Sequence, residues 1–100
     1  MDEAELIRST LYKDTGEKTD YLPANGKEFT LEELQTAVKG NIEFIYLDSV
    51  PLIVVVNENG LNMEDAKINY TPTLICSAYK NNWEQMLVGN VLITENRFIK

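Results

Sequence analysis

The sequence has 100 residues, contains no histidine, and has a single cysteine, Cys76. Without histidine the chain lacks the side chain that most often serves as a general base or a metal ligand. Neither a Ser-His-Asp nor a Cys-His arrangement can form within one such chain, and one cysteine cannot hold zinc or an iron–sulfur cluster. We therefore predict that the protein is not an enzyme and has no catalytic residues, no cofactor and no metal.

The chain also lacks signals for export or for membrane insertion. Its first residues, Met1–Glu5, are acidic where a secretory signal needs a basic region and then an apolar one. The longest strongly apolar run, Val50–Val56, is far shorter than the roughly 20 residues that span a bilayer. A lone cysteine excludes an internal disulfide and suits a reducing compartment. We expect a cytoplasmic protein with an inert, buried thiol.

Basic residues are scarce. Sixteen acidic residues face nine basic ones, which gives a formal net charge of −7, and the acidic residues are spread from Asp2 to Glu95. Proteins that bind nucleic acid need a basic patch that displaces counterions from phosphates, so we expect no direct contact with DNA or RNA. The charge has two interpretations: a solubilising surface, or a surface that imitates DNA and captures a basic protein.

The clearest structural signals lie between Phe29 and Gly40. Thr30 can cap a helix, and Glu33 three residues later can reach back to the Thr30 amide in a capping box. Phe29 and Leu34 flank the cap as a hydrophobic staple. Gly40 can adopt the left-handed conformation that ends a helix. We therefore predict one main helix that begins after Thr30 and ends at Gly40.

Two strands are predicted after this helix. In the run from Ile42 to Leu47 both alternating faces are largely apolar, which predicts an interior strand. The run Leu52–Val56 is β-branched and uninterrupted. Only residues 48–51 separate the two runs, and so short a connection joins antiparallel neighbours.

Strand signals also stand before the helix and near the end of the chain. Residues 6–12 and 19–22 flank a turn-rich segment and predict an N-terminal hairpin. After the second hairpin, Asn62 can cap a helical turn over residues 63–67, and Thr71-Pro72 can begin a second short helix. Residues 71–80 could also form a strand, and we favour the helix. Val91–Thr94 predicts a last strand inside the sheet, and residues 97–100 could add an edge.

Together these signals predict a single domain over residues 1–100 with an α+β fold. The order is ββαββ, then short helices and a final strand, in a mostly antiparallel or mixed sheet of about five strands with one main helix packed on it. No repeat or linker divides the chain.

Two aromatic residues are candidates for contact with a partner. Tyr79 and Trp83 flank the polar residues 80–82, and Tyr and Trp are favoured anchors in protein interfaces. The alternative is that both side chains cover the edge of the sheet. No basic residues interleave with the aromatic ones, as single-strand nucleic-acid binders require.

Three segments of the sequence resemble a known family: KEFTLEELQTAVKGNIEFIYLD, VVVNENG and LVGNVLITENRFIK. The order and content of these segments are similar to those of the domain of unknown function numbered 3846, found on phages, plasmids and conjugative elements. The resemblance implies a small accessory protein of a bacterial mobile element, and it brings no catalytic residues.

We expect such a protein to act by binding a protein partner, through a helix face or through the region from Tyr79 to Trp83. One alternative is an acidic DNA mimic that blocks a defence or regulatory protein. Another is a binder of a small ligand such as a nucleotide signal, with a pocket at a subunit interface lined by some of four residues: Arg8, Arg97, Tyr79 and Trp83. The sequence does not predict the oligomeric state. We expect no contact with a membrane.

Overall fold

A computed structural model describes residues 8–60 and 65–100 of the chain. These residues form a five-stranded sheet with two helices and a short 3-10 turn. In chain order the elements are β1 (Ser9–Tyr12), β2 (Lys18–Asp20), α1 (Leu31–Val38), β3 (Ile42–Tyr46), β4 (Leu52–Asn57), α2 (Tyr70–Tyr79), β5 (Val91–Glu95) and a 3-10 turn (Asn96–Phe98).

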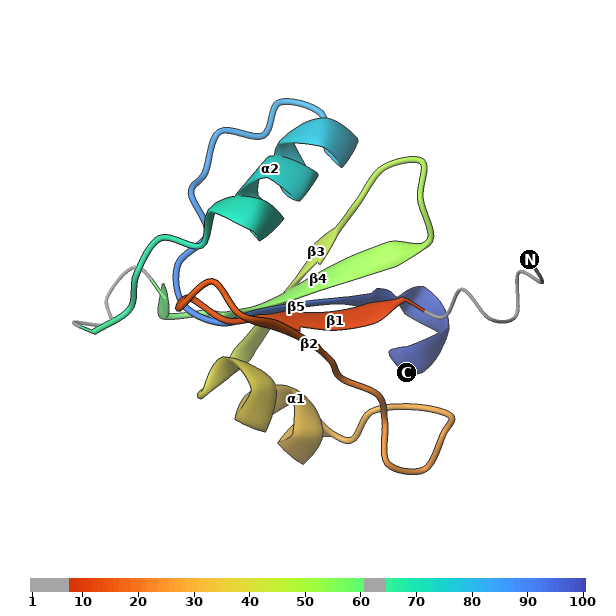
Figure 1. Ribbon diagram of the computed structural model, residues 1–100. Coiled ribbons are helices and arrows are strands. Elements are labelled where there is room, and N and C mark those ends of the chain that lie inside the picture. Colours follow the sequence, from red (N-terminus) through yellow and green to blue (C-terminus); the bar gives the residue numbers. More distant parts are fainter. Residues whose placement is uncertain (1–7, 61–64) are drawn as a thin grey trace.

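The strands lie in the order β2-β1-β5-β4-β3, and every neighbouring pair is antiparallel. The predicted α+β fold, the N-terminal hairpin, the ββαββ order and the interior position of the last strand are confirmed. The two helices cover opposite faces of the sheet, α1 on one and α2 on the other (Figure 1). We predicted a single main helix on the sheet, so the second helical layer is an addition to the expected architecture.

The central strands β4 and β5 are buried on both faces. Ile53 and Val55 join the apolar cluster on the α1 face, and Val54 and Val56 join the cluster on the α2 face. This alternation follows from the two-residue period of a strand. The uninterrupted apolar run in β4 is thus explained, because a helix lies over each side of the sheet.

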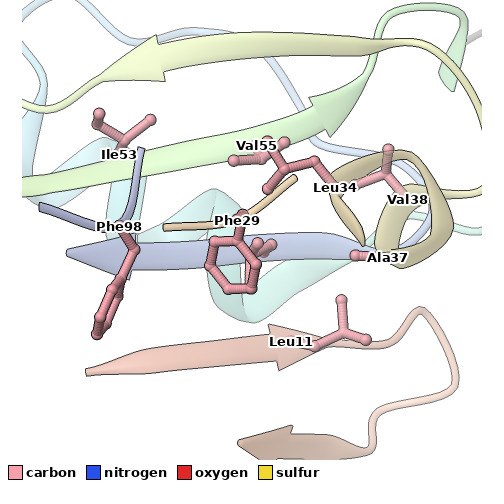
Figure 2. Close-up of a cluster of buried hydrophobic side chains, with 9 residues drawn as sticks. Leu11, Phe29, Leu34, Ala37, Val38, Ile53, Val55 and Phe98 are labelled. Carbon is pink, nitrogen blue, oxygen red and sulfur yellow. The ribbon is translucent and has the colours of Figure 1, made fainter. Parts of the chain in front are cut away.

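The cluster on the α1 face joins the helix to three strands. Leu34, Ala37 and Val38 of α1 share this cluster with Val55 of β4, and Figure 2 shows Leu34 beside Val55 with Phe29 lying over the sheet. Phe29 stacks on Tyr21 with ring centroids 5.5 Å apart and meets the edge of Phe98. Phe29 therefore does more than staple the helix start: it links the N-terminal hairpin to the C-terminal turn.

The predicted capping box at the start of α1 is present. The Glu33 amide donates to Thr30 Oγ1 at 3.1 Å, and the Thr30 amide donates to Glu33 Oε1 at 2.8 Å. The other carboxylate oxygen of Glu33 accepts from the Ala24 amide at 2.9 Å. These hydrogen bonds, first that from Thr30 and then that from Ala24, hold the pKa of the Glu33 carboxyl below its usual value.

The predicted end of α1 is wrong by one residue. Lys39, not Gly40, adopts the left-handed conformation, with φ of 64°. Gly40 is required by space: a Cβ at Gly40 would lie 2.5 Å from Asn57 Nδ2. That nitrogen donates to the carbonyls of Val38 and Lys39 at 3.1 and 3.2 Å, so Asn57 at the end of β4 satisfies the C-terminal carbonyls of α1.

The predicted interior position of β3 is also wrong. Among the strands of the described residues, β3 pairs with β4 alone and forms one edge of the sheet. Both of its faces carry apolar residues because Phe44 packs against the α1-face cluster and Ile45 belongs to the α2-face cluster. Cover from two helical layers gives an edge strand the same pattern as an interior strand.

The second half of the chain brings further corrections. The helix predicted over residues 71–80 is confirmed, but it begins at Tyr70 and its N-cap is Asn69 rather than Thr71. The turn predicted over residues 63–67 lies partly on residues 61–64, which are outside the described residues, and Ala66 and Lys67 are not helical. The tail adds no strand, because Asn96–Phe98 forms a 3-10 turn. No helix in the two described stretches is long and apolar enough to cross a membrane.

Candidate functional site

The surface of α2 stands out because it carries no charge. No residue from Ile68 to Tyr79 is charged, whereas 25% of the whole chain is. Pro72, Thr73 and Cys76 face the sheet and are buried. Tyr70 and Leu74, one helical turn apart, point outward and are 64% and 67% exposed. We call Tyr70, Leu74 and Ala78 the α2 outer face.

Buried hydrogen bonds fix the first turn of α2 to the rest of the fold. The Asn69 side-chain nitrogen donates to the carbonyls of Tyr12 and Gly89, both at 2.9 Å. Thr73 Oγ1 donates to the Asn69 carbonyl at 2.8 Å and accepts from the Leu87 amide at 2.9 Å. The side chain of Asn69 makes no hydrogen bond to the helix that it precedes, because it joins α2 to β1 and to the strand-like segment before β5.

The end of α2 is fixed to the outer end of β3. The Asp48 amide donates to the Tyr79 carbonyl at 2.7 Å, and Lys80 Nζ donates to the Tyr46 carbonyl at 2.9 Å. The Asn81 amide in turn donates to Asp48 Oδ2 at 3.0 Å. The α2 outer face is therefore held at both ends of the helix, so its side chains are presented on an ordered element.

The two residues predicted to contact a partner lie in different environments. Tyr79 is 46% exposed at the end of α2. Trp83 is partly buried and packs against the α2-face cluster, and its Nε1 atom is buried without a hydrogen-bond partner in residues 8–60 and 65–100. The Tyr79 ring is thus exposed to solvent, while Trp83 joins the segment after α2 to the α2-face cluster.

Sequence reasoning missed the most exposed apolar side chains of this region, Tyr70 and Leu74. In the structure Leu74 faces solvent, because small and polar residues take the buried side. The signal that could have revealed the outer face is the absence of charge from Ile68 to Tyr79.

Cys76 lies on the sheet-facing side of α2 and is fully buried. Burial raises the pKa of its thiol to about 11, while the nearby Lys80 acts in the opposite direction. A buried thiol with a raised pKa is a poor nucleophile.

The structure brings only part of the proposed small-ligand site together. The Arg8 amide donates to Glu95 Oε2 at 2.9 Å, and the Arg97 guanidinium lies 3.5 Å from the same oxygen. The Arg97 guanidinium also stacks over the Phe98 ring, 4.7 Å from its centroid. Within the described ranges, no group of three or more acidic or cysteine side chains is arranged to hold a metal ion.

Comparison with known proteins finds a matching family. The sequence model of a family described as "Domain of unknown function (DUF3846)" matches residues 10–98. No curated protein and no solved structure matches the chain significantly.

Proposed function

The chain belongs to this DUF3846 family, and we propose that it acts by binding another protein through the α2 outer face rather than by catalysing a reaction. The observation that carries the proposal is an uncharged, exposed apolar stripe on a chain with a net charge of −7. Protein interfaces are depleted of charge at their centres and are enriched in tyrosine. Tyr70 and Leu74 fit this description.

The way in which α2 is held supports the same proposal. Hydrogen bonds of Asn69 and Thr73 anchor one end of the helix, and Tyr79 and Lys80 anchor the other. Binding to an ordered helix costs less conformational entropy than binding to a loop that must first become ordered. In this arrangement Tyr79 extends the contact surface and Trp83 supports the chain beneath it.

The setting that we propose is that of an accessory protein of a bacterial mobile element. The resemblance of the capped-helix segment and the closing strand to proteins of phages and plasmids supports this setting. The acidic surface is consistent with a role against a host protein, and the contact itself is assigned to the uncharged face.

The proposal is tested by comparing two leucine variants. Tagged wild-type protein, Leu74→Glu and Leu22→Glu are used to capture partners from the native host, with each fold checked by circular dichroism. Leu22 is 51% exposed in a loop, so the two variants add the same charge at similarly exposed sites. We expect Leu74→Glu to reduce capture of a specific partner by roughly tenfold or more, as at an interface centre, and Leu22→Glu to have little effect.

A series of salt washes separates this mechanism from DNA mimicry. A partner held by an apolar face stays bound as salt rises, whereas a basic partner held by the acidic surface is released. Equal capture by both variants together with release by salt would contradict the proposal. That result would instead favour the DNA-mimic alternative.

A further inference from the structure

Within residues 8–60 and 65–100, no strand pairs with the outer edge of β3. The Glu58 amide donates to the Asn41 carbonyl at 3.0 Å, which shows that the backbone groups of Asn41 point toward β4. Because these groups alternate along a strand, Glu43 and Ile45 also bond to β4, and Ile42, Phe44 and Tyr46 point away from the sheet. The bond from Lys80 Nζ to the Tyr46 carbonyl agrees with this assignment.

An apolar groove follows this edge on the α1 face of the sheet. The groove has a volume of about 460 Å³, and Leu31, Leu34, Ile42 and Phe44 are among the residues that line it. Leu31 is largely exposed on the helix side, and Phe44 is partly buried beside Tyr46, with the two ring centroids 6.3 Å apart. A side chain added next to Phe44 on this face would therefore meet apolar surface.

The opposite face of the same edge is acidic. A second groove, of about 260 Å³, is lined by Glu43 of β3 and Glu58 just after β4, together with Ile45 and Met86. Glu43 and Glu58 are both exposed. A side chain added next to Glu43 on this face would therefore meet negative charge.

We propose that β3 binds a short, extended segment of another protein, in which apolar and basic residues alternate, as an added antiparallel strand. An added strand places successive side chains on opposite faces of the sheet. Apolar side chains opposite Ile42 and Phe44 fill the α1-face groove. Basic side chains between them lie beside Glu43, where opposite charges on neighbouring strands stabilise the pair. Every other strand pair of the sheet is already antiparallel.

The edge does not suit a second copy of the chain. In a symmetric pairing centred on Phe44, Gly40 of the second copy would lie opposite Asp48. The Asp48 amide points away from the sheet and donates to the Tyr79 carbonyl at 2.7 Å, so the end of α2 already occupies that position. A segment about as long as the five residues of β3 avoids this obstruction.

The experiment measures the affinity of a capped peptide of about seven residues in which valine and lysine alternate. Directly opposite residues of antiparallel strands share a face of the sheet, so the valines of the peptide lie opposite Ile42 and Phe44. Two N-methylated forms of the same peptide provide the matched comparison. Valine amides face β3 and lysine amides face solvent, so methylation on valine should weaken binding by roughly tenfold or more, and methylation on lysine should have little effect. The reverse order, equal effects, or no binding at millimolar peptide would overturn the proposal.

Protein variants locate the site and separate it from the α2 outer face. Glu43→Gln should weaken binding of the peptide by about two- to fivefold. Glu17→Gln, which removes the same charge from the exposed β1–β2 turn, should leave the affinity unchanged. Amide shifts in NMR spectra should be largest at Ile42 and Phe44. Leu74→Glu should leave peptide affinity unchanged, so failure at this edge and failure of the proposed α2 function are distinguishable. Shifts centred on α2 would contradict the strand-addition model.

Discussion

Asn57 is the residue through which the hairpin of β3 and β4 holds the end of α1. It is 8% exposed, its side-chain nitrogen donates to the carbonyls of Val38 and Lys39, and its side-chain oxygen accepts from the Asn59 amide at 2.8 Å. The substitution Asn57→Asp changes almost no volume but replaces the donor by a second acceptor. At neutral pH a carboxylate then faces two carbonyl oxygens.

The expected loss of stability follows from these contacts. Two hydrogen bonds, each with a net contribution of about 1 kcal/mol, are lost, and buried acceptors without partners add a desolvation cost. We expect the free energy of unfolding to fall by about 2–4 kcal/mol at pH 7. Burial and the facing carbonyls raise the pKa of the introduced carboxyl above its unfolded value of about 3.9. The substitution therefore costs least stability below about pH 3.9, and the cost grows as pH rises from the unfolded pKa of about 3.9 through the higher folded pKa.

Urea unfolding followed by circular dichroism at pH 4 and pH 7 measures this change. Asn59→Asp is the matched control, because Asn59 is exposed and the substitution adds the same charge next to the same turn. If the two variants lose equal stability at pH 7, or if Asn57→Asp loses no more there than at pH 4, the assigned role of Asn57 is wrong.

Three further outcomes are expected. Cys76, whose thiol has a pKa raised to about 11 by burial, should resist thiol reagents at pH 8 in the folded protein and react fully in denaturant; rapid modification without unfolding would show that the site opens. Thr73→Val should cost about 1–3 kcal/mol because the buried Leu87 amide loses its acceptor, while Thr73→Ser, which keeps the hydroxyl, should cost less in the same unfolding assay. Hydrogen bonds lower the pKa of the Glu33 carboxyl in the folded state. The contribution of the ionised carboxyl to folding stability is therefore present above the unfolded pKa of about 4.3 and is lost as pH falls through the folded pKa. Glu33→Gln should therefore make the thermal midpoint less dependent on pH in this acidic range, and an unchanged dependence would exclude the effect.

The local part of the fold could be predicted from the sequence. The capping box of Thr30 and Glu33 needs only residues three positions apart, and the hairpin turns need only the short spacing between strand runs. The place of each strand in the sheet depends on pairings between distant residues. The pairings of Val54 with Ile93 and of Leu11 with Leu92 put β5 between β4 and β1. This order leaves β3 at an edge, which the apolar residues on both of its faces do not reveal.

The candidate binding surface could be predicted only in part. Tyr79 is exposed as its proposed role requires, but Tyr70 and Leu74 were not identified as surface residues. Which side of α2 is buried depends on two hydrogen bonds with residues distant in the sequence: Asn69 donates to the Tyr12 carbonyl, and Thr73 accepts from the Leu87 amide. Such bonds bury a threonine and leave a leucine in solvent, which reverses the usual preference.

The two proposed binding surfaces differ in their physical properties. The α2 outer face offers uncharged side chains on an ordered helix, and the β3 edge offers backbone hydrogen bonds beside an apolar groove and acidic side chains. Lys80 lies between them, since it follows α2 and donates to Tyr46 of β3.

Site-specific photo-crosslinking in the native host tests the central claim most directly. A photoreactive side chain is introduced at position 74 and, as a control, at position 22. Binding through the α2 outer face predicts a covalent adduct with one other protein from position 74 and no matching adduct from position 22. An adduct of two copies of the chain, or the same adducts from both positions, would contradict the account.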